Sequence, residues 1–509
     1  METIIKTGAE FKDEKTSSAC AFQMAGAWMT TCLTEHTRCI QSTVKSEPPI
    51  LPTRVIDVGP PDGSESPRLH LGRKDRGLYF TLSYRWGEGN AALFQTTEAN
   101  LEAYKTSIPL SALPKTMQDA ITIARRFRIR YLWIDALCIV QDSEEDWRAE
   151  AKRMASVYKN SLLTIAAAAD STEEGGCFRT RSRRQVRPFP SESYWPDGST
   201  KYIFADRRAT RDGARPVSAI DKRAWVLQEQ VLSPRVLSYS NNELYWDCIS
   251  LNASETFPDG IPYFYDADMK LPDVRVLKEA IIGGAKTAIS RTRFYSSWRK
   301  IVEEYSRRKT SKESDKLVAL LGMSKEAAIF LEDDFYLGSW RTTLWKDLLW
   351  RVVKPQSLAR PQNFVAPTWS WASISDPISF ELVGTDTVDT ITQCLEIIRV
   401  EIGPDQTQAD LSGQLTVHGK LVPMPSENTA RLNWREDVRG MDSTDLKCLI
   451  VAESTYHVYA LGLSELANER GYYKRVGTMS WSTVFERFRS ETRERKSEGP
   501  VLMQTICIR

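Results

Sequence analysis

Apolar strands and amphipathic helices alternate along the first half of the chain. YFTLSY at 79–84 predicts a strand, and in LPKTMQDAITIARRF, which follows at 113–127, the apolar residues recur at helical spacing. YLWIDALCIV at 131–140 and SLLTIAAAA at 161–169 are nearly continuously apolar, as strands covered on both faces are. This order predicts an α/β fold with a parallel sheet and helices on both of its faces.

A second predicted helix, between the last two of these strands, carries a carboxylate on its buried side. Trp147 and Tyr158 mark its apolar stripe, and a projection at 100° per residue places Glu150 about 60° from Trp147. A carboxylate in that position is either functional or held in a structural ion pair. Arg153 and Arg223 are the two partners that we consider for such a pair.

Polar and aromatic residues follow the predicted strands at their carboxyl ends. Ligands of open parallel sheets bind beyond these ends, so we expect the residues there to converge with the carboxylate of Glu150. These residues are Ser83, Tyr84, Arg85, Trp86 and Asp135. A G-x-G-x-x-A pattern at 87–92 follows the first strand, but no acidic residue stands about 20 positions on, so we interpret it as a simple loop.

The remaining pattern divides the chain into four parts. Residues 1–76 are polar and Pro-rich, and we expect an N-terminal extension with one short strand at 53–58. Residues 77–250 form the α/β domain. Residues 251–362 have helical periodicity, and residues 363–509 alternate as strands do, which predicts a helical region followed by a β-rich C-terminal domain.

Composition and charge exclude several classes of protein. The 509 residues are 41% hydrophobic and 26% charged, and 68 Lys and Arg against 66 Asp and Glu leave a net charge of +2. This balance predicts neither nucleic acid nor membrane as a partner, and the basic run at 179–187 is expected to be a solvated loop. Nine cysteines without an apolar leader favour reduced thiols in the cytoplasm. The 15 tryptophans are expected to be mainly packing residues.

Three residues near the N-terminus have metal-ligand spacing. Cys32, His36 and Cys39 form C-x3-H-x2-C, which a helix places on one side. Thiolate and imidazole suit zinc, but a structural site needs a fourth ligand, for which the sequence offers only the distant Cys20. The alternative is a buried helix face on which the thiols pack as small apolar groups.

Three blocks resemble the fungal heterokaryon incompatibility (HET) domain, and the resemblance spans about residues 50–250. They are LSYRWG at 82–87, the segment from LPKTMQDAI to SLLTIAAA at 113–168, and RAWVLQEQVLSPRVL at 223–237. The resemblance implies a cytoplasmic fungal protein linked to non-self recognition and programmed cell death. It also implies a fold similar to the TIR domain, a flavodoxin-like α/β sheet.

Some TIR proteins cleave NAD at the nicotinamide glycosidic bond with a glutamate in a W-x-x-E pattern, which Trp147 to Glu150 match. The resemblance therefore implies Glu150 as a catalytic residue and NAD as a substrate, with no cofactor required. We expect Tyr84 and Trp86 to stack on a ring, Arg85 to reach phosphate, and Asp135 to shape the pocket. The list of expected substrate-binding residues is Ser83, Tyr84, Arg85, Trp86, Asp135 and Arg223.

Two other classes of function stay open. No nucleotide-binding oligomerisation domain, ankyrin series or WD40 repeats accompany the region that resembles a HET domain, so the sequence indicates no sensor or assembly platform. A stand-alone enzyme of fungal secondary-metabolite biosynthesis would use the same pocket for a cofactor-independent isomerisation, cyclisation or condensation. A non-catalytic interaction module would leave Glu150 in a salt bridge. Self-association as a homo-oligomer is compatible with all three.

Overall fold

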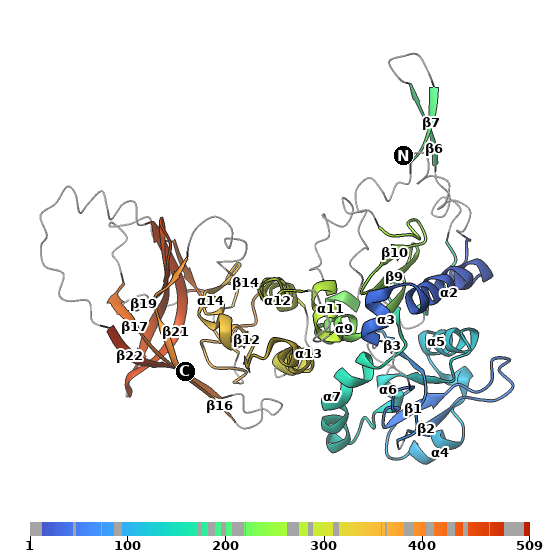
Figure 1. Cartoon of the computed structure of the whole chain (residues 1–509). Coiled ribbons are helices and arrows are strands. Elements are labelled where there is room, and N and C mark those ends of the chain that lie inside the picture. Colours follow the sequence, from blue (N-terminus) through green and yellow to red (C-terminus); the bar gives the residue numbers. More distant parts are fainter. Residues whose placement is uncertain are drawn as a thin grey trace, which may run out of the picture. The chain divides into compact units, whose positions relative to one another are not determined.

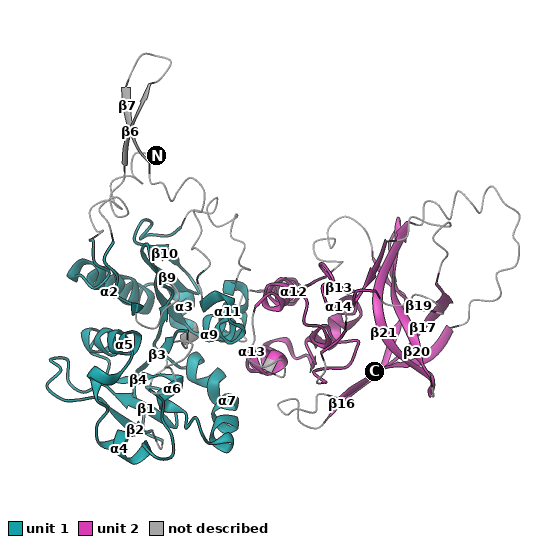
Figure 2. Cartoon of the chain, turned by 180° about the vertical axis from the view of Figure 1, so that it is seen from behind, with its two compact units in different colours: residues 1–288 teal, residues 289–509 magenta. Residues whose placement is uncertain are grey.

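The computed structural model divides the chain into two compact units, residues 1–288 and 289–509, which are described separately (Figures 1 and 2). The structure describes residues 13–43, 47–72, 74–85, 94–169, 175–181, 189–194, 200–205, 218, 220–261, 274–283, 289–308, 315–357, 359–361, 364–380, 391–403, 412–424, 433–440, 446–467, 469–482 and 503–509.

The first unit is built on an eight-stranded sheet in the order β10-β9-β8-β5-β3-β4-β1-β2. The strands are β1 (Arg54–Asp57), β2 (Arg68–Leu71), β3 (Tyr79–Ser83), β4 (Tyr131–Trp133), β5 (Leu163–Ala167), β8 (Arg235–Tyr239), β9 (Leu244–Cys248) and β10 (Asn252–Ser254). The four central strands, β4, β3, β5 and β8, are parallel, and both edges are antiparallel. The sequence prediction of an α/β sheet with parallel strands is confirmed.

Helices cover both faces of this sheet, with α5 on one side and α7 on the other in both views (Figures 1 and 2). The helices are α2 (Ala19–Thr34), α3 (Thr37–Thr43), α4 (Leu101–Thr106), α5 (Lys115–Arg126), α6 (Asp135–Cys138), α7 (Glu144–Lys159), α9 (Ala224–Leu232) and α11 (Val274–Gly283). Short 3-10 turns are η2 (Leu110–Ala112) and η4 (Ile220–Lys222), and β6 (Phe189–Tyr194) pairs with β7 (Thr200–Ala205) as a hairpin.

Local sequence explains where α7 begins. The Ser143 side chain accepts a hydrogen bond from the backbone N–H of Asp146, which caps the helix. Three acidic residues, Glu144 to Asp146, fill the first turn, where the helix dipole favours negative charge. Asp146 also pairs with the buried Arg54 of β1, whose Nε donates to the Cys138 carbonyl at 2.6 Å. This contact ties the start of α7 to α6 and to the sheet.

Three details of the first unit differ from the sequence prediction. The expected strand at 131–140 ends at Trp133, because Asp135 begins the short helix α6 and accepts from the backbone N–H of Ala136. Trp147, expected on the buried stripe of α7, is 37% exposed, since the buried face passes through Glu150 and Tyr158 instead. Residues expected to form an N-terminal extension contribute β1 and β2 to the sheet.

The second unit begins with helices and small sheets. These elements are α12 (Arg291–Ser306), α13 (Asp315–Leu331), β11 (Phe335–Tyr336), β12 (Ser339–Trp340), η6 (Arg341–Thr343), α14 (Leu344–Asp347), β13 (Trp350–Val352), η7 (Trp371–Ser373) and β14 (Ile378–Phe380). Five tryptophans in this part are fully buried: Trp298, Trp340, Trp350, Trp369 and Trp371. The prediction that most tryptophans are packing residues is confirmed for these positions.

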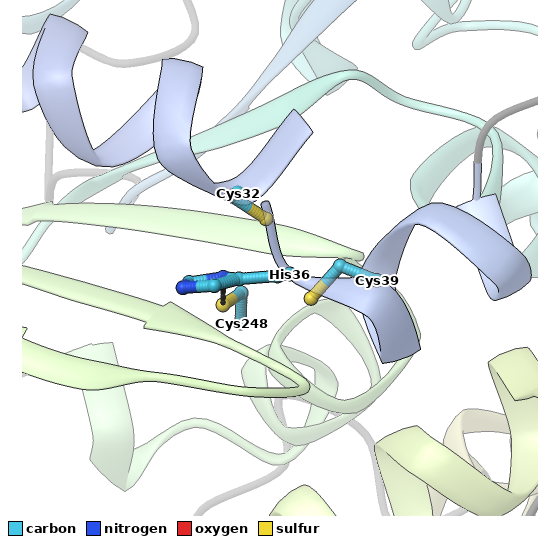
Figure 3. A group of neighbouring side chains, drawn as sticks. All are labelled: Cys32, His36, Cys39 and Cys248. Atoms are coloured by element: carbon cyan, nitrogen blue, oxygen red, sulfur yellow. Dashed lines mark hydrogen bonds between the residues drawn. The ribbon is translucent and has the colours of Figure 1, made fainter. Parts of the chain in front are cut away.

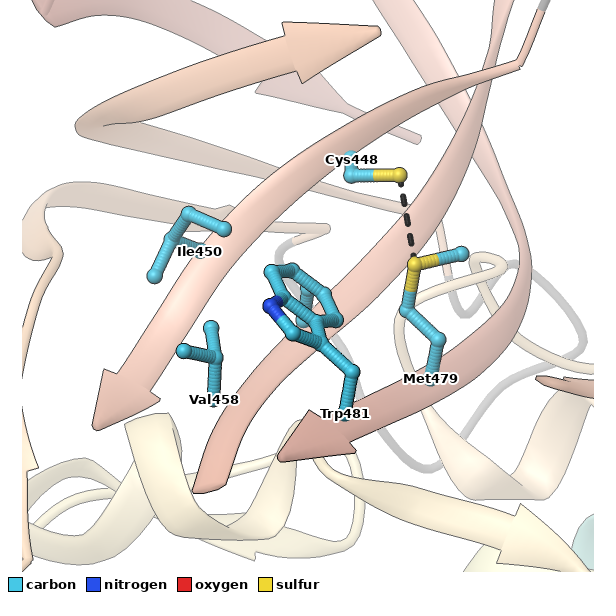
Figure 4. Close-up of a cluster of buried hydrophobic side chains, with 6 residues drawn as sticks. Cys448, Ile450, Val458, Met479 and Trp481 are labelled. Carbon is cyan, nitrogen blue, oxygen red and sulfur yellow. Dashed lines mark hydrogen bonds between the residues drawn. The ribbon is translucent and has the colours of Figure 1, made fainter. Parts of the chain in front are cut away.

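The C-terminal part is β-rich, as predicted. Its strands are β15 (Thr392–Gln393), β16 (Glu396–Ile402), β17 (Gly413–Pro423), β18 (Asn433–Glu436), β19 (Lys447–Glu453), β20 (His457–Leu466), β21 (Glu469–Ser482) and β22 (Met503–Ile508). Strands β19, β20, β21, β22 and β17 pair in this order, and β17 pairs again with β19, so the five close into a barrel. Cys448, Met479 and Trp481 belong to its apolar core (Figure 4).

Among the described residues, no helix combines the length and the apolar character that a bilayer span requires.

Candidate functional site

The connections of the parallel strands diverge at the carboxyl ends of β3 and β5. The chain leaves β3 through α5, on one face of the sheet, to reach β4; it leaves β5 towards α9, on the other face, to reach β8. Ser83, the last residue of β3, pairs with Ala166 of β5 at this point. In open α/β sheets, ligands bind where neighbouring connections diverge in this way.

A buried glutamate of α9 lies beside these strand ends. Glu229 is 8% exposed, and its Oε2 makes no hydrogen bond within the described part of the chain. Burial raises the pKa of the Glu229 carboxyl to about 7, the negative charge of Asp135 adds to this effect, and the Ser83 hydroxyl and the charge of Arg223 oppose it. A carboxyl group that titrates near neutral pH in such a position is suited to acid–base or electrostatic chemistry.

Four of the residues predicted to bind substrate gather around Glu229. The charges of Asp135 and Arg223 act on its carboxyl, and the Ser83 hydroxyl is adjacent to it. Arg223 donates to the Tyr84 carbonyl with 2.7 Å between Nη1 and O. Burial raises the pKa of the Tyr158 hydroxyl far above its usual value, and the charges of Glu229 and Asp135 raise it further. Of the other two residues predicted to bind substrate, Arg85 is exposed and Trp86 lies outside the described residues. The G-x-G-x-x-A pattern also lies outside the described residues.

Glu150, the catalytic residue expected from the sequence, lines a different space. Its side chain is 1% exposed, and its Oε1 accepts a hydrogen bond from Arg153 Nη1 at 2.8 Å. Arg153 also donates to Thr53 Oγ1 at 3.2 Å. A cavity of about 540 Å³ is lined by Ile50, Leu51, Pro52, Thr53, Leu71, Lys74, Tyr79, Glu150, Arg153, Ser156, Val157 and Asn160. None of the predicted substrate-binding residues lines this cavity.

Sequence reasoning missed Glu229 and Tyr158 as site residues. A signal for Glu229 was present, because Gln228, Glu229 and Gln230 are consecutive polar residues inside an otherwise apolar helix. All three are buried, at 2%, 8% and 7% exposure. Consecutive positions on a helix point in different directions, so three buried polar side chains in a row require polar surroundings on several sides.

The predicted metal ligands Cys32, His36 and Cys39 are also brought together, at the end of β9 (Figure 3). The fourth member of the cluster is Cys248, the last residue of β9. Cys20, the fourth ligand considered from the sequence, is exposed at the start of α2 and lies outside the cluster. Cys20 lies more than three helical turns before Cys32 on the same helix, so Cys248 takes the fourth place for which the sequence offered only Cys20.

Residues 79–229 match the family model described as heterokaryon incompatibility protein (HET). The matched segment begins with β3 and ends at Glu229, so it includes the ends of β3 and β5 and the residues around Glu229. No curated protein and no solved structure matches the chain.

Proposed function

Because the chain carries a HET domain, we propose that this domain binds NAD at the carboxyl ends of β3 and β5 and hydrolyses its nicotinamide glycosidic bond. The observation that carries the proposal is the buried carboxyl group of Glu229, whose pKa lies at about 7 beside residues that could hold a nucleotide. Loss of NAD would suit a role in the programmed cell death of fungal incompatibility. A cytoplasmic location, expected from the cysteine content, would supply the substrate.

The strand order supports a TIR-like fold for this domain. Across the sheet, the four parallel strands lie in the order β4-β3-β5-β8. Numbered by their order along the chain, they therefore lie as second, first, third and fourth. This is the order of flavodoxin-like sheets, whose ligands bind between the first and third strands. The corresponding place here lies between Ser83 and Ala166, where Glu229 is found.

The reaction needs one negative charge in the right position. Nicotinamide leaves with the electron pair of the C–N bond and becomes neutral, so no acid is required, and positive charge develops on the ribose ring. The ionised Glu229 would stabilise this oxocarbenium character and accept hydrogen bonds from ribose hydroxyls. Water then adds to the ribose carbon, and the products are nicotinamide, ADP-ribose and one proton.

Glu229 is better suited to this role than Glu150. The carboxylate of Glu150 already accepts a hydrogen bond from the guanidinium of Arg153, which offsets its negative charge. The carboxyl group of Glu229 lies beside the hydroxyls of Ser83 and Tyr158 and near the charge of Arg223, but its Oε2 has no hydrogen-bond partner among the described residues. The Glu150 ion pair agrees with what an interaction module would contain, so the two glutamates have to be tested separately.

The test is to incubate the purified full-length protein with NAD and to separate nicotinamide and ADP-ribose by liquid chromatography. Glu229→Gln should reduce turnover by at least about 100-fold, because a neutral amide cannot stabilise the cation. Glu144→Gln, at an exposed position of α7, is the matched control and should not change turnover.

The outcome distinguishes the three classes of function. If Glu150→Gln abolishes turnover and Glu229→Gln does not, Glu150 is the catalytic residue, as the W-x-x-E pattern suggests. If concentrated wild-type protein releases no nicotinamide, the NAD hydrolysis proposal is wrong, and cofactor-independent biosynthesis or a non-catalytic role remains.

A further inference from the structure

Four potential metal ligands from three elements of the first unit meet at one point (Figure 3). Cys32 lies in the last turn of α2, His36 lies between α2 and α3, and Cys39 lies in α3. Cys248 ends β9, more than 200 residues further along the chain. Because the cluster does not depend on one helix alone, the tertiary fold itself must bring these side chains together.

The distances match a tetrahedral zinc site. All four ligand atoms lie within 4.8 Å of one another, and Cys248 Sγ lies 3.5 Å from His36 Nδ1. In a tetrahedral site with Zn–S of about 2.3 Å and Zn–N of about 2.0 Å, sulfurs lie about 3.8 Å apart and sulfur and nitrogen about 3.5 Å apart. A contraction of less than about 1 Å therefore brings all four ligands into range.

The surroundings of the sulfur atoms suit thiolates. The buried Arg235 of β8 points its Nε at Cys32 Sγ at 3.2 Å, and the backbone N–H of Leu251 donates to Cys248 Sγ at 3.3 Å. The Sγ of Cys39 lies 3.4 Å from the hydroxyl of Ser250. Donors aimed at sulfur stabilise negative charge on it, as the outer hydrogen bonds of metal-bound thiolates do.

The types of ligand atom indicate which metal would bind and whether the site is structural or catalytic. Three sulfurs and one imidazole nitrogen favour zinc over magnesium or calcium, which prefer oxygen ligands. The three cysteines are at most 1% exposed, and His36 is half-buried. Four protein ligands in a closed site leave no open coordination position, which is the arrangement of structural zinc sites and not of catalytic ones.

We propose that Cys32, His36, Cys39 and Cys248 bind one Zn²⁺ ion, which fastens the N-terminal helices α2 and α3 to the end of β9. The matched HET segment, residues 79–229, contains none of these four residues. The ion would therefore join segments on either side of the matched segment, and would hold β9 beside β8, the strand that follows α9. This proposal is independent of NAD hydrolysis.

The first experiment measures metal in the purified, reduced, full-length protein. Inductively coupled plasma mass spectrometry should find about one zinc per chain after gel filtration. Replacement by Co²⁺ should produce the visible absorption bands of tetrahedral cobalt–thiolate coordination. Wild-type protein that retains less than about a tenth of an equivalent after incubation with zinc, or that shows octahedral cobalt spectra, would overturn the proposal.

Variants assign the ligands. Cys248→Ser and His36→Ala should lose most of the zinc, whereas Cys20→Ser, an exposed cysteine of the same helix α2, should retain the wild-type content. If Cys248→Ser fails to fold, alkylation of wild-type protein replaces it, because bound zinc should protect Cys32, Cys39 and Cys248 until a chelator is added. Equal labelling of these three thiols before and after chelation would count against the site.

Discussion

Arg153 donates a hydrogen bond to Glu150 one turn earlier in α7, with 2.8 Å between Nη1 and Oε1. The two side chains differ in their surroundings, since Glu150 is 1% exposed and Arg153 is 55% exposed. The guanidinium therefore reaches from solvent to cover a buried carboxylate. This asymmetry predicts that the two residues contribute unequally to stability.

Replacing Arg153 by Met should lower the free energy of unfolding by about 1–3 kcal/mol, because it leaves a buried carboxylate without its hydrogen-bonding partner. Glu150→Gln should cost less than about 1 kcal/mol, since the exposed Arg153 can be solvated by water. Urea unfolding followed by circular dichroism measures both. Arg148→Ala, which removes an exposed pair on the same helix, is the control. Equal losses for the two variants would contradict the argument.

The buried carboxyl group of Glu229 should make the stability of the first unit depend on pH. Its pKa is about 7 in the folded state and 4.5 in the unfolded chain, so the folded state holds the proton more tightly. Protonation of Glu229 therefore stabilises the folded state fully below pH 4.5, and this stabilisation is lost as the pH rises through 7. The loss corresponds to up to about 3 kcal/mol.

Glu229→Gln removes this titration and should therefore be more stable than wild type at about pH 8, with the gain diminishing towards about pH 5. Thermal unfolding at intervals of one pH unit measures the difference. Glu144→Gln changes an exposed carboxylate and should show no such trend. A difference between wild type and Glu229→Gln that stays constant with pH would show that Glu229 does not titrate in this range.

The same group should control the rate of the proposed NAD hydrolysis. Only the ionised carboxylate stabilises the positive charge on the ribose, so kcat/KM should rise between about pH 6 and pH 8 and level off above. Nicotinamide release is measured at each pH, with NAD alone subtracted as the control. A profile with no inflection near neutral pH would separate Glu229 from the chemical step.

The sequence allowed the α/β class and most strand positions to be predicted, because apolar runs at the sheet centre depend on local pattern alone. It put Ser83, Tyr84 and Asp135 at the ends of neighbouring strands, and the structure brings these residues together with Arg223 around Glu229. The proposed catalytic carboxylate is harder to predict, since the projection of α7 shows that Glu150 is buried but not which cavity it faces. Glu229 lies beside the end of β3 because the connection after β5 crosses to the other face of the sheet.

The metal cluster shows the same limit. Spacing reveals that Cys32, His36 and Cys39 share one side of a helical segment, but it carries no information on a strand end such as Cys248. Only the antiparallel pairing of β8 with β9 places Cys248 beside the arginine that points at Cys32. Contacts across such distances in sequence depend on topology, which no local pattern encodes.

Arg475 and Asp437 form a buried ion pair in the second unit, and its disruption should be costly. Both side chains are at most 1% exposed, and Nε and Nη2 of Arg475 each lie 3.1 Å from a carboxylate oxygen of Asp437. The guanidinium also donates to the Leu348 carbonyl at 2.6 Å and lies 3.3 Å from the ring centre of Trp350. Burial lowers the pKa of Arg475 to about 10, so the side chain stays charged at neutral pH.

Arg475→Met should destabilise the second unit by about 1–3 kcal/mol, because the buried Asp437 would keep only its ion pair with Arg360 and the carbonyls of Leu348 and Trp350 would lose their donor. Arg475→Lys should also be destabilising, since one ammonium cannot replace the planar fork that contacts Asp437, Leu348 and Trp350 together. Urea unfolding monitored by tryptophan fluorescence should show the loss in the transition of that unit. Arg399→Ala, in an exposed pair with Glu401, should change stability by less than about 0.5 kcal/mol. If Arg475→Lys had the same free energy of unfolding as the wild type, the positive charge alone would account for the stabilisation, and the planar geometry of the guanidinium would not contribute.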